Sequence, residues 1–174
     1  SGTAHDIPSK MACLRCHGTH PLGGGRPSRM LGFSAIQLSH PDSDVTLEDL
    51  SDTLTHPPED TYTVPGDPVT QAALGYLHAN CGNCHHREAD RVPQVDLSFW
   101  LSFNTSTVEE TDAWTTAVSQ NNALFNDQHV IARIAPGNPE ESSVIYRMSQ
   151  RGNTAQMPPV ATENQDDSGI AAIQ

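Results

Sequence analysis

The sequence predicts a mostly helical fold in which short helices alternate with long loops. Two observations favour this class. Several segments carry helix signals, whereas residues 130–134 are the one candidate strand. In addition, the 174 residues include 13 prolines and 12 glycines, which interrupt regular structure. We therefore expect helices that are separated by irregular connections.

In the first half, three segments are expected to be helical. Residues 10–17 should form a short helix and residues 33–38 one or two turns. Residues 46–54 carry leucines at the i, i+3, i+7 spacing of a helix face. Residues 21–27 contain three consecutive glycines and should form a loop. Residues 56–67 are rich in proline and polar residues, which indicates a boundary between two halves.

The second half opens with the clearest helix signal. Asp67 is a suitable N-cap, and Pro68 fits the first position of a helix that runs to Asn80. The apolar face expected for this helix comprises Ala72, Ala73, Tyr76 and Leu77.

Two further helices and a final one are expected downstream. Residues 91–104 should be extended or irregular, and residues 106–118 should be helical. Residues 138–150 begin with asparagine, proline and glutamate at the N-cap, first and second positions of a helix, with another glutamate at the third. Asp167 is a candidate cap for the last helix.

All four cysteines of the chain lie in two copies of one motif, Cys-x-x-Cys-His. On a helix, positions i, i+3 and i+4 share one face. Two thiols can then bond to two edges of one porphyrin, while the histidine supplies the proximal nitrogen to the iron. The sequence therefore predicts two covalently attached c-type haems. The attachment residues are Cys13, Cys16, Cys81 and Cys84, and the proximal ligands are His17 and His85.

Other uses of paired cysteines fit less well. Zinc ribbons separate their pairs by roughly 15–20 residues, and Cys16 and Cys81 lie much farther apart. A thioredoxin-like motif requires a β-α-β context that the sequence lacks. Two disulfides would not require a histidine after each second cysteine.

The composition agrees with a protein that relies on its cofactors for a core. Hydrophobic residues make up 36% and aromatic residues 5%, which is thin for a chain of this length. We expect the haems to supply a large part of the apolar interior and to stabilise the native state.

The charge excludes one class of partner. The net charge is −12, with Lys10 and eight arginines as the cations, so a nucleic-acid-binding face is not expected. A charged partner should present a basic docking face, although a solvated acidic surface without a docking role is the alternative. No apolar run is long enough to span a membrane.

The distal ligands are less strongly specified than the proximal ones. For the second haem the candidate is Met157, because a thioether is a soft iron ligand and the following prolines stiffen its loop. Met148 is the rival, although its place beside Val144 and Ile145 favours packing. For the first haem the candidate is Met30, which follows the glycine-rich loop, with His40 as the alternative. Further alternatives are His56, His78 and an iron without a distal protein ligand.

Several further side chains are candidates for contacts with the haems. Arginines can pair with propionates, and aromatic rings can pack on porphyrin edges, although ordinary core packing is the alternative. These candidates are Arg26, Arg29, Arg133, Trp100, Phe103 and Trp114.

The second half resembles a class I cytochrome c domain. The resemblance covers residues 69–174 and rests on the helix before the second motif, on residues 135–140 (Ala-Pro-Gly-Asn-Pro-Glu), and on Met157 with its two prolines. The whole chain resembles bacterial exported di-haem cytochromes through residues 31–38 and 76–81. The first half departs from class I cytochromes, since it is short and lacks a Met-Pro loop after its motif.

The resemblance implies cytochrome c-like helices and loops wrapped around two haems, and electron transfer as the function. We expect a first haem-binding segment over residues 1–66 and a class I cytochrome c-like domain over residues 67–174. The expected function is that of a single-electron carrier or relay, not an enzyme, because no acid/base constellation is recognisable. A di-haem enzyme of the peroxidase or sulfur-oxidising type, with one open iron, is the alternative; a haem-based sensor or an assembly module is a third.

Bacterial c-type haem is attached outside the cytoplasm, so the expected location is periplasmic or extracellular. The start at Ser1 is interpreted as a mature or trimmed end and not as a signal peptide. The chain would carry an export signal in its gene product, or belong to a larger exported chain or complex.

The two motifs generate a direct prediction. After expression in a host that matures c-type cytochromes, the intact mass under denaturing conditions should exceed the polypeptide mass by two haem groups. A mass with one haem or none would contradict the interpretation of the motifs.

Overall fold

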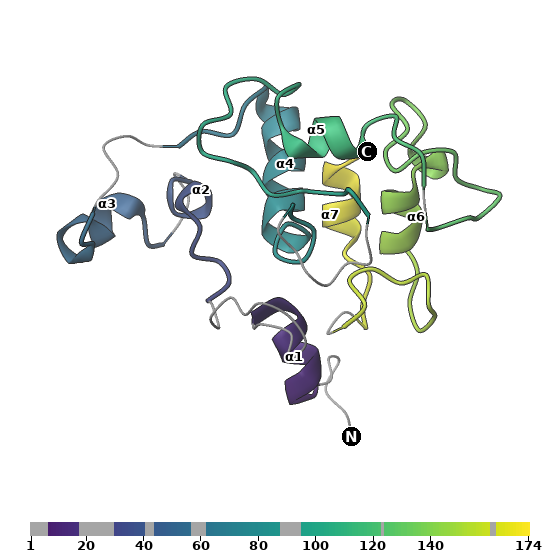
Figure 1. The fold of residues 1–174 in the computed structure, drawn as a ribbon, viewed down its shortest axis with the longest axis horizontal. Coiled ribbons are helices and arrows are strands. Elements are labelled where there is room, and N and C mark those ends of the chain that lie inside the picture. Colours follow the sequence, from purple (N-terminus) through teal and green to yellow (C-terminus); the bar gives the residue numbers. More distant parts are fainter. Residues whose placement is uncertain are drawn as a thin grey trace.

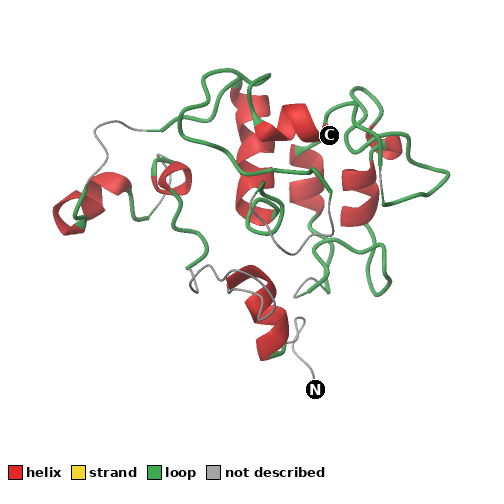
Figure 2. Ribbon diagram, in the orientation of Figure 1, coloured by secondary structure: helices red, strands yellow, loops and turns green. Residues whose placement is uncertain are grey.

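The computed structural model describes residues 7–17, 30–40, 44–56, 62–87, 95–122, 124–160 and 163–174. Regular structure in these ranges is helical, and most of the described residues lie in loops and turns (Figure 2). The elements are α1 (Lys10–His17), α2 (Ala35–Leu38), α3 (Leu47–Leu50), the 3-10 helix η1 (Ser51–Thr53), α4 (Pro68–Asn80), α5 (Asp112–Ala117), the 3-10 helix η2 (Pro139–Glu141), α6 (Ser143–Met148) and α7 (Asp167–Ala172).

The helices of the second half form one group. In Figure 1, α4, α5, α6 and α7 lie together, with α4 and α7 packed side by side. Helices α1, α2 and α3 lie outside this group, toward the N-terminal end of the chain. The expected helix over residues 10–17 is confirmed by α1.

The short helices of the first half are held by capping boxes. In α2 the Ser34 hydroxyl accepts the Gln37 N–H, and in α3 the Thr46 hydroxyl accepts the Asp49 N–H. In both, the residue at the third position bonds back to the N-cap backbone, so two terminal donors are satisfied at once. The expected turns over residues 33–38 and 46–54 are confirmed by these elements.

Helix α4 has the predicted bounds, and its predicted apolar face is confirmed at the buried Leu77, whereas Ala73 and Tyr76 are only half-buried. The Asp67 carboxylate accepts the Thr70 N–H at 2.8 Å, as an N-cap should. The side chains that it buries are Leu74, Leu77 and His78, whereas Ala72 is exposed. The reason is tertiary: the core lies on the side of the helix where a later irregular segment crosses it.

Two predicted helices are shorter than their patterns indicated. Helix α5 begins only at Asp112, because the Thr111 hydroxyl accepts the Trp114 N–H and fixes the start there. The predicted helix over residues 138–150 is divided into η2 and α6, because Ser142 adopts an extended backbone between them. Asp166, and not Asp167, caps α7 by accepting the Gly169 N–H.

The candidate strand over residues 130–134 is not formed. Among the described residues, this segment has two isolated β-bridges and no ladder. One joins Val118 to Ile134, and the other joins Ala132 to Ser142. Its Arg133 N–H donates to the Gln120 carbonyl instead of joining a ladder.

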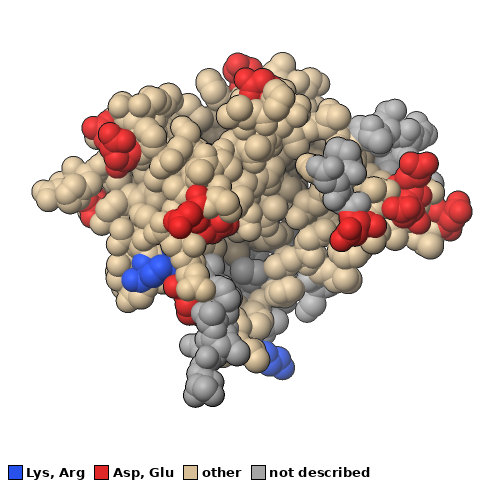
Figure 3. All heavy atoms as spheres, turned by 180° about the vertical axis from the view of Figure 1, so that it is seen from behind, with Lys and Arg blue, Asp and Glu red and all other residues tan. Residues whose placement is uncertain are grey.

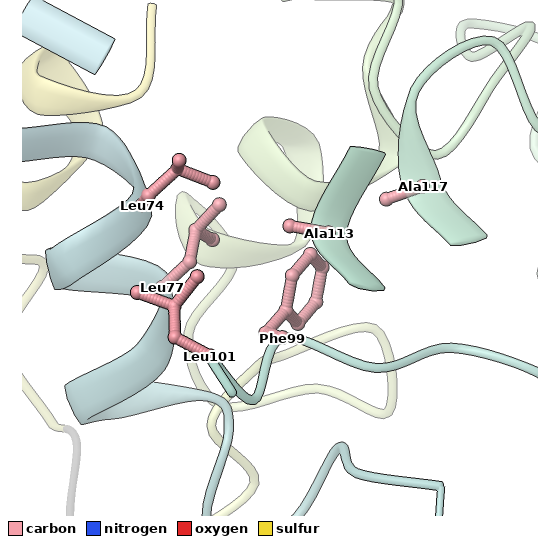
Figure 4. Packing of buried hydrophobic residues seen from close by; sticks show 6 residues of the cluster. All are labelled: Leu74, Leu77, Phe99, Leu101, Ala113 and Ala117. Carbon is pink, nitrogen blue, oxygen red and sulfur yellow. The ribbon is translucent and has the colours of Figure 1, made fainter. Parts of the chain in front are cut away.

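The buried core is small and contains short side chains. Its main cluster joins α4, α5 and the irregular segment between them (Figure 4): Leu74, Leu77, Phe99, Leu101, Ala113 and Ala117. Ile36 and Val64, which precede the expected boundary at residue 66, also pack against this cluster. A second cluster joins α6 and α7 through Ile145, Met148 and Ile170.

The contact between α4 and α7 generates a stability prediction. A Cβ atom on Gly169 would overlap the Tyr76 ring, whose hydroxyl donates to Asp166 at 2.9 Å. Gly169→Ala should therefore lower the free energy of unfolding by about 1–3 kcal/mol. Gly75→Ala is the matched control, because a Cβ there meets nothing within 4 Å; it should be neutral or stabilise by up to about 1 kcal/mol. Denaturant unfolding of both variants checks this, and equal effects would contradict it.

Candidate haem-binding site

The second motif forms a hydrogen-bonded turn directly after the end of α4. The Cys81 N–H donates to the Leu77 carbonyl at 2.9 Å, and the His85 N–H donates to the Cys81 carbonyl at 2.8 Å. The last bond spans four residues, as in a helical turn, and it brings the backbone of His85 close to that of Cys81. The side chains of Cys81, Cys84 and His85 are half-buried, and neither cysteine is in a disulfide. Burial raises the pKa of the Cys81 thiol to about 12.

Gly82 allows the turn to approach its neighbours closely. A Cβ at this position would lie 2.6 Å from the His78 carbonyl oxygen and 3.1 Å from the Phe99 carbonyl oxygen. Both neighbours are backbone atoms that cannot move aside like the end of a flexible side chain. The close approach brings residues 98–101 against the turn.

Within the described ranges no strand pairs with residues 98–101, and other groups satisfy several of their backbone donors. The Phe99 N–H donates to the His85 carbonyl at 2.8 Å, and the Leu101 N–H donates to Nδ1 of His78 at 3.0 Å. The Ser98 N–H donates to the Thr116 hydroxyl at 2.9 Å. The segment is thus bonded to the motif, to α4 and to α5.

A charged cluster holds the chain that follows the motif against the same segment. Arg87 donates from Nε to one carboxylate oxygen of Asp112 at 2.7 Å, and the Ser98 hydroxyl donates to the other at 2.7 Å. Asp112, the first residue of α5, therefore joins the chain just after the motif to the segment that begins at Ser98.

The His85 ring is enclosed and neutral at pH 7. Phe99 lies edge-on to it at 5.9 Å between centroids. Burial lowers the pKa of His85 to about 4, and the charges of Arg147, His86 and Arg133 act in the same direction. Its buried Nδ1 has no hydrogen-bond partner in the described part of the chain. A neutral imidazole is the form that binds iron.

His78 connects the two halves of the chain. It is 1% exposed. A backbone N–H can only donate, so Nδ1 accepts from Leu101 and the proton lies on Nε2, which donates to the Ser34 hydroxyl at 2.8 Å. Both ring nitrogens are thereby engaged, and this arrangement leaves neither for an iron.

Met157 lies in a loop that returns along α6. Its side chain is half-buried, and its N–H donates to the Arg147 carbonyl at 3.0 Å. The peptide bond to Pro158 is cis. Met148, the rival candidate, is 6% exposed and packs against Ile145 and Ile170. The expectation that Met148 serves packing is confirmed.

The first motif lies on α1, apart from this site. Cys13 and His17 are exposed on the helix, and the side chain of Cys16 lies outside the described residues. Met30 is 72% exposed, and His40 is exposed as well. The distal ligand of the first haem therefore stays a prediction.

The other candidates have varied surroundings. Arg133 is buried and donates to the carbonyls of Asp96 and Thr116, so its guanidinium already has backbone partners. Trp100 packs on His78 at 4.5 Å and on His86 at 6.4 Å between ring centroids. The following candidates are exposed: Phe103, Trp114 and His56. Arg26 and Arg29 lie outside the described residues.

Three residues of this site were missed from the sequence. Phe99 could have been found, because apolar residues alternate at positions 97, 99 and 101 as in a buried extended segment. Nothing in the spacing of Gly82 or Arg147 indicates their roles, since both depend on segments far away in the chain.

No protein-family model, curated protein or solved structure matches the chain. Within the described ranges, no group of three His, Cys, Asp or Glu side chains is placed to hold a metal ion. No helix in those ranges is both long and apolar enough to cross a membrane.

His78 generates a prediction about acid stability. Burial lowers its pKa from 6.5 to about 4. Between these values the unfolded chain binds a proton that the folded chain does not, so the free energy of unfolding falls as the pH decreases from 6.5 to 4, by about 3 kcal/mol at most. His78→Gln should cost stability at pH 7.5 but lose less on going to pH 4.5. Urea unfolding at both pH values measures this, and parallel losses in both proteins would refute it.

Proposed function

We propose that this protein is a di-haem c-type cytochrome that carries single electrons between redox partners outside the cytoplasm. The observation that carries the proposal is the turn over residues 81–85. Two half-buried cysteines outside any disulfide and one half-buried imidazole, which burial keeps neutral, lie within that turn. Few prosthetic groups other than a c-type haem require two cysteines followed directly by a histidine.

The residues of the turn fit a covalently bound haem. Cys81 and Cys84 would form the two thioether bonds, and His85 would be the proximal ligand. The unpartnered Nδ1 supports this, because a buried polar atom without a partner requires an explanation beyond the protein's own hydrogen bonds. The bound haem supplies an iron that accepts and releases one electron.

The polypeptide's own contribution is to hold and enclose these ligands. Phe99 covers one edge of the His85 ring, and its N–H fixes the His85 backbone. Met157 would be the distal ligand, and a thioether raises the reduction potential relative to a second histidine. Cys13, Cys16 and His17 would hold the first haem in the same way, with Met30 or His40 opposite.

The surface supports a carrier that docks on basic partners. The net charge is −12. On the face drawn in Figure 3, Asp and Glu side chains are spread over several places and Lys and Arg side chains are fewer. An acidic surface steers a basic redox protein toward it and repels an acidic one.

A di-haem enzyme is the second candidate, favoured by the exposure of Met30 and His40. If neither side chain binds the first iron, that iron has an open position. Oxidised spectra distinguish the two candidates, since two low-spin six-coordinate haems indicate a carrier and one high-spin haem indicates an enzyme or sensor.

Substitution of Met157 tests the ligand set. Met157→Ala should remove the sulfur-to-iron charge-transfer band at the red end of the oxidised spectrum and lower the potential of one haem. Met148→Ala is the matched control. It should lower the free energy of unfolding by about 2–5 kcal/mol, because it opens a cavity in the core, and leave the band intact. The reverse pattern would assign the ligand to Met148.

The salt dependence of electron transfer tests the carrier role. Stopped-flow oxidation by a basic acceptor should slow as ionic strength rises, because the Debye length is about 10 Å at 0.1 M. An acidic acceptor of similar potential should show the opposite trend. Rates with the basic acceptor that do not depend on salt would contradict electrostatic docking, and rapid peroxide turnover would favour the enzyme.

A further inference from the structure

Arg147, in the last turn of α6, contacts the Met157 loop at two points. Its Nε donates to the Ala155 carbonyl at 2.9 Å, and its own carbonyl accepts the Met157 N–H at 3.0 Å. The two contacts lie on either side of Gln156. They fix the backbone that leads into the methionine side chain relative to α6.

The loop also has internal hydrogen bonds. Gln156 accepts the Gly152 N–H at 2.8 Å through Oε1 and donates to the Pro158 carbonyl at 3.1 Å through Nε2. Gly152 has a φ of +73°, which glycine adopts without strain. These bonds shape the loop but do not join it to the helix. Of the two bonds to Arg147 that do, the one from Nε to the Ala155 carbonyl is the one that depends on the arginine side chain.

The surroundings of Arg147 strengthen this hold. The guanidinium is half-buried and lies over the Phe125 ring at 4.8 Å from its centroid. A hydrogen bond from a charged donor is stronger away from water. The surroundings of Arg147 thus favour a well-ordered side chain at the base of the loop that carries Met157.

We propose that Arg147 is a positioning residue for the second haem: it holds the Met157 loop so that the thioether would remain bound to the iron for which His85 would be the other protein ligand. This inference rests on the proposed function, in which His85 and Met157 are the axial ligands. A thioether presented by a loop competes poorly with outside ligands unless the loop is held in place beforehand.

Imidazole competition tests the proposal on the intact di-haem protein. The part of the sulfur-to-iron band that Met157→Ala removes defines the signal of the second haem. Imidazole is then titrated into oxidised wild type, Arg147→Ala and Arg147→Lys, and loss of that signal is followed. Arg147→Ala should bind imidazole at least about tenfold more tightly than wild type, equivalent to about 1.4 kcal/mol. Arg147→Lys, which keeps a charge but not the planar donor group, should fall between them.

Arg151→Ala is the matched control. Arg151 donates to the carbonyls of Met148, Gln150 and Asn164, which lie at the end of α6 and beyond the loop. This variant should bind imidazole within about twofold of wild type. Denaturant unfolding is measured in parallel, because a purely structural arginine would lower stability without changing imidazole affinity.

The outcomes separate the two proposals. If Met157→Ala keeps the whole band, the ligand set is wrong and the role of Arg147 falls with it. If Met157→Ala removes the band but Arg147→Ala binds imidazole like wild type, the role of Arg147 alone is overturned. If Arg147→Ala does not mature, the titration of Arg147→Lys decides, and wild-type affinity there overturns the inference.

Discussion

The close approach of residues 98–101 to the turn over residues 81–85 is the contact on which the second half depends. It requires glycine at position 82, because a side chain there would meet two carbonyl oxygens. Once the segment is in place, Phe99 covers the His85 ring, and Leu101 joins the core of α4 and α5. The candidate ligand and the core are therefore positioned by the same few backbone contacts.

In the part of the chain that the structure describes, a buried histidine takes the place of a strand partner for this segment. In a sheet, a neighbouring strand would accept the Leu101 N–H; here the neutral ring of His78 does so. The other ring nitrogen then donates to Ser34, the N-cap of α2. One side chain thus satisfies a buried donor and connects the first half of the chain to the second.

The core contains alanine and serine where larger side chains would normally lie, since Ala117 and Ser98 are fully buried. Apolar burial contributes about 25 cal/mol for each Å² removed from water, so short side chains contribute little. In the proposed di-haem protein the porphyrins supply the missing apolar area. The second haem would lie among side chains that already have structural roles. Arg147 would hold the loop of the proposed ligand Met157, and Phe99 would hold the proposed ligand His85.

The sequence by itself determined the features that depend on neighbours in the chain. Asp67 with Pro68 fixes the start of α4, and Ser34 and Thr46 cap the turns that follow them, because capping involves residues three positions apart. The candidate attachment residues at positions 81 and 84 and the histidine at 85 follow from spacing in the same way.

Tertiary structure decided the features that depend on distant residues. The buried face of α4 shifted toward Leu74 and His78, because the core position is set by a segment about 20 residues later. Helix signals over residues 106–118 and 138–150 were shortened by a cap at Thr111 and an extended Ser142. The contact of Arg147 with the Met157 loop lies beyond any local pattern, because a helix face and the loop that returns along it meet only when the chain has folded.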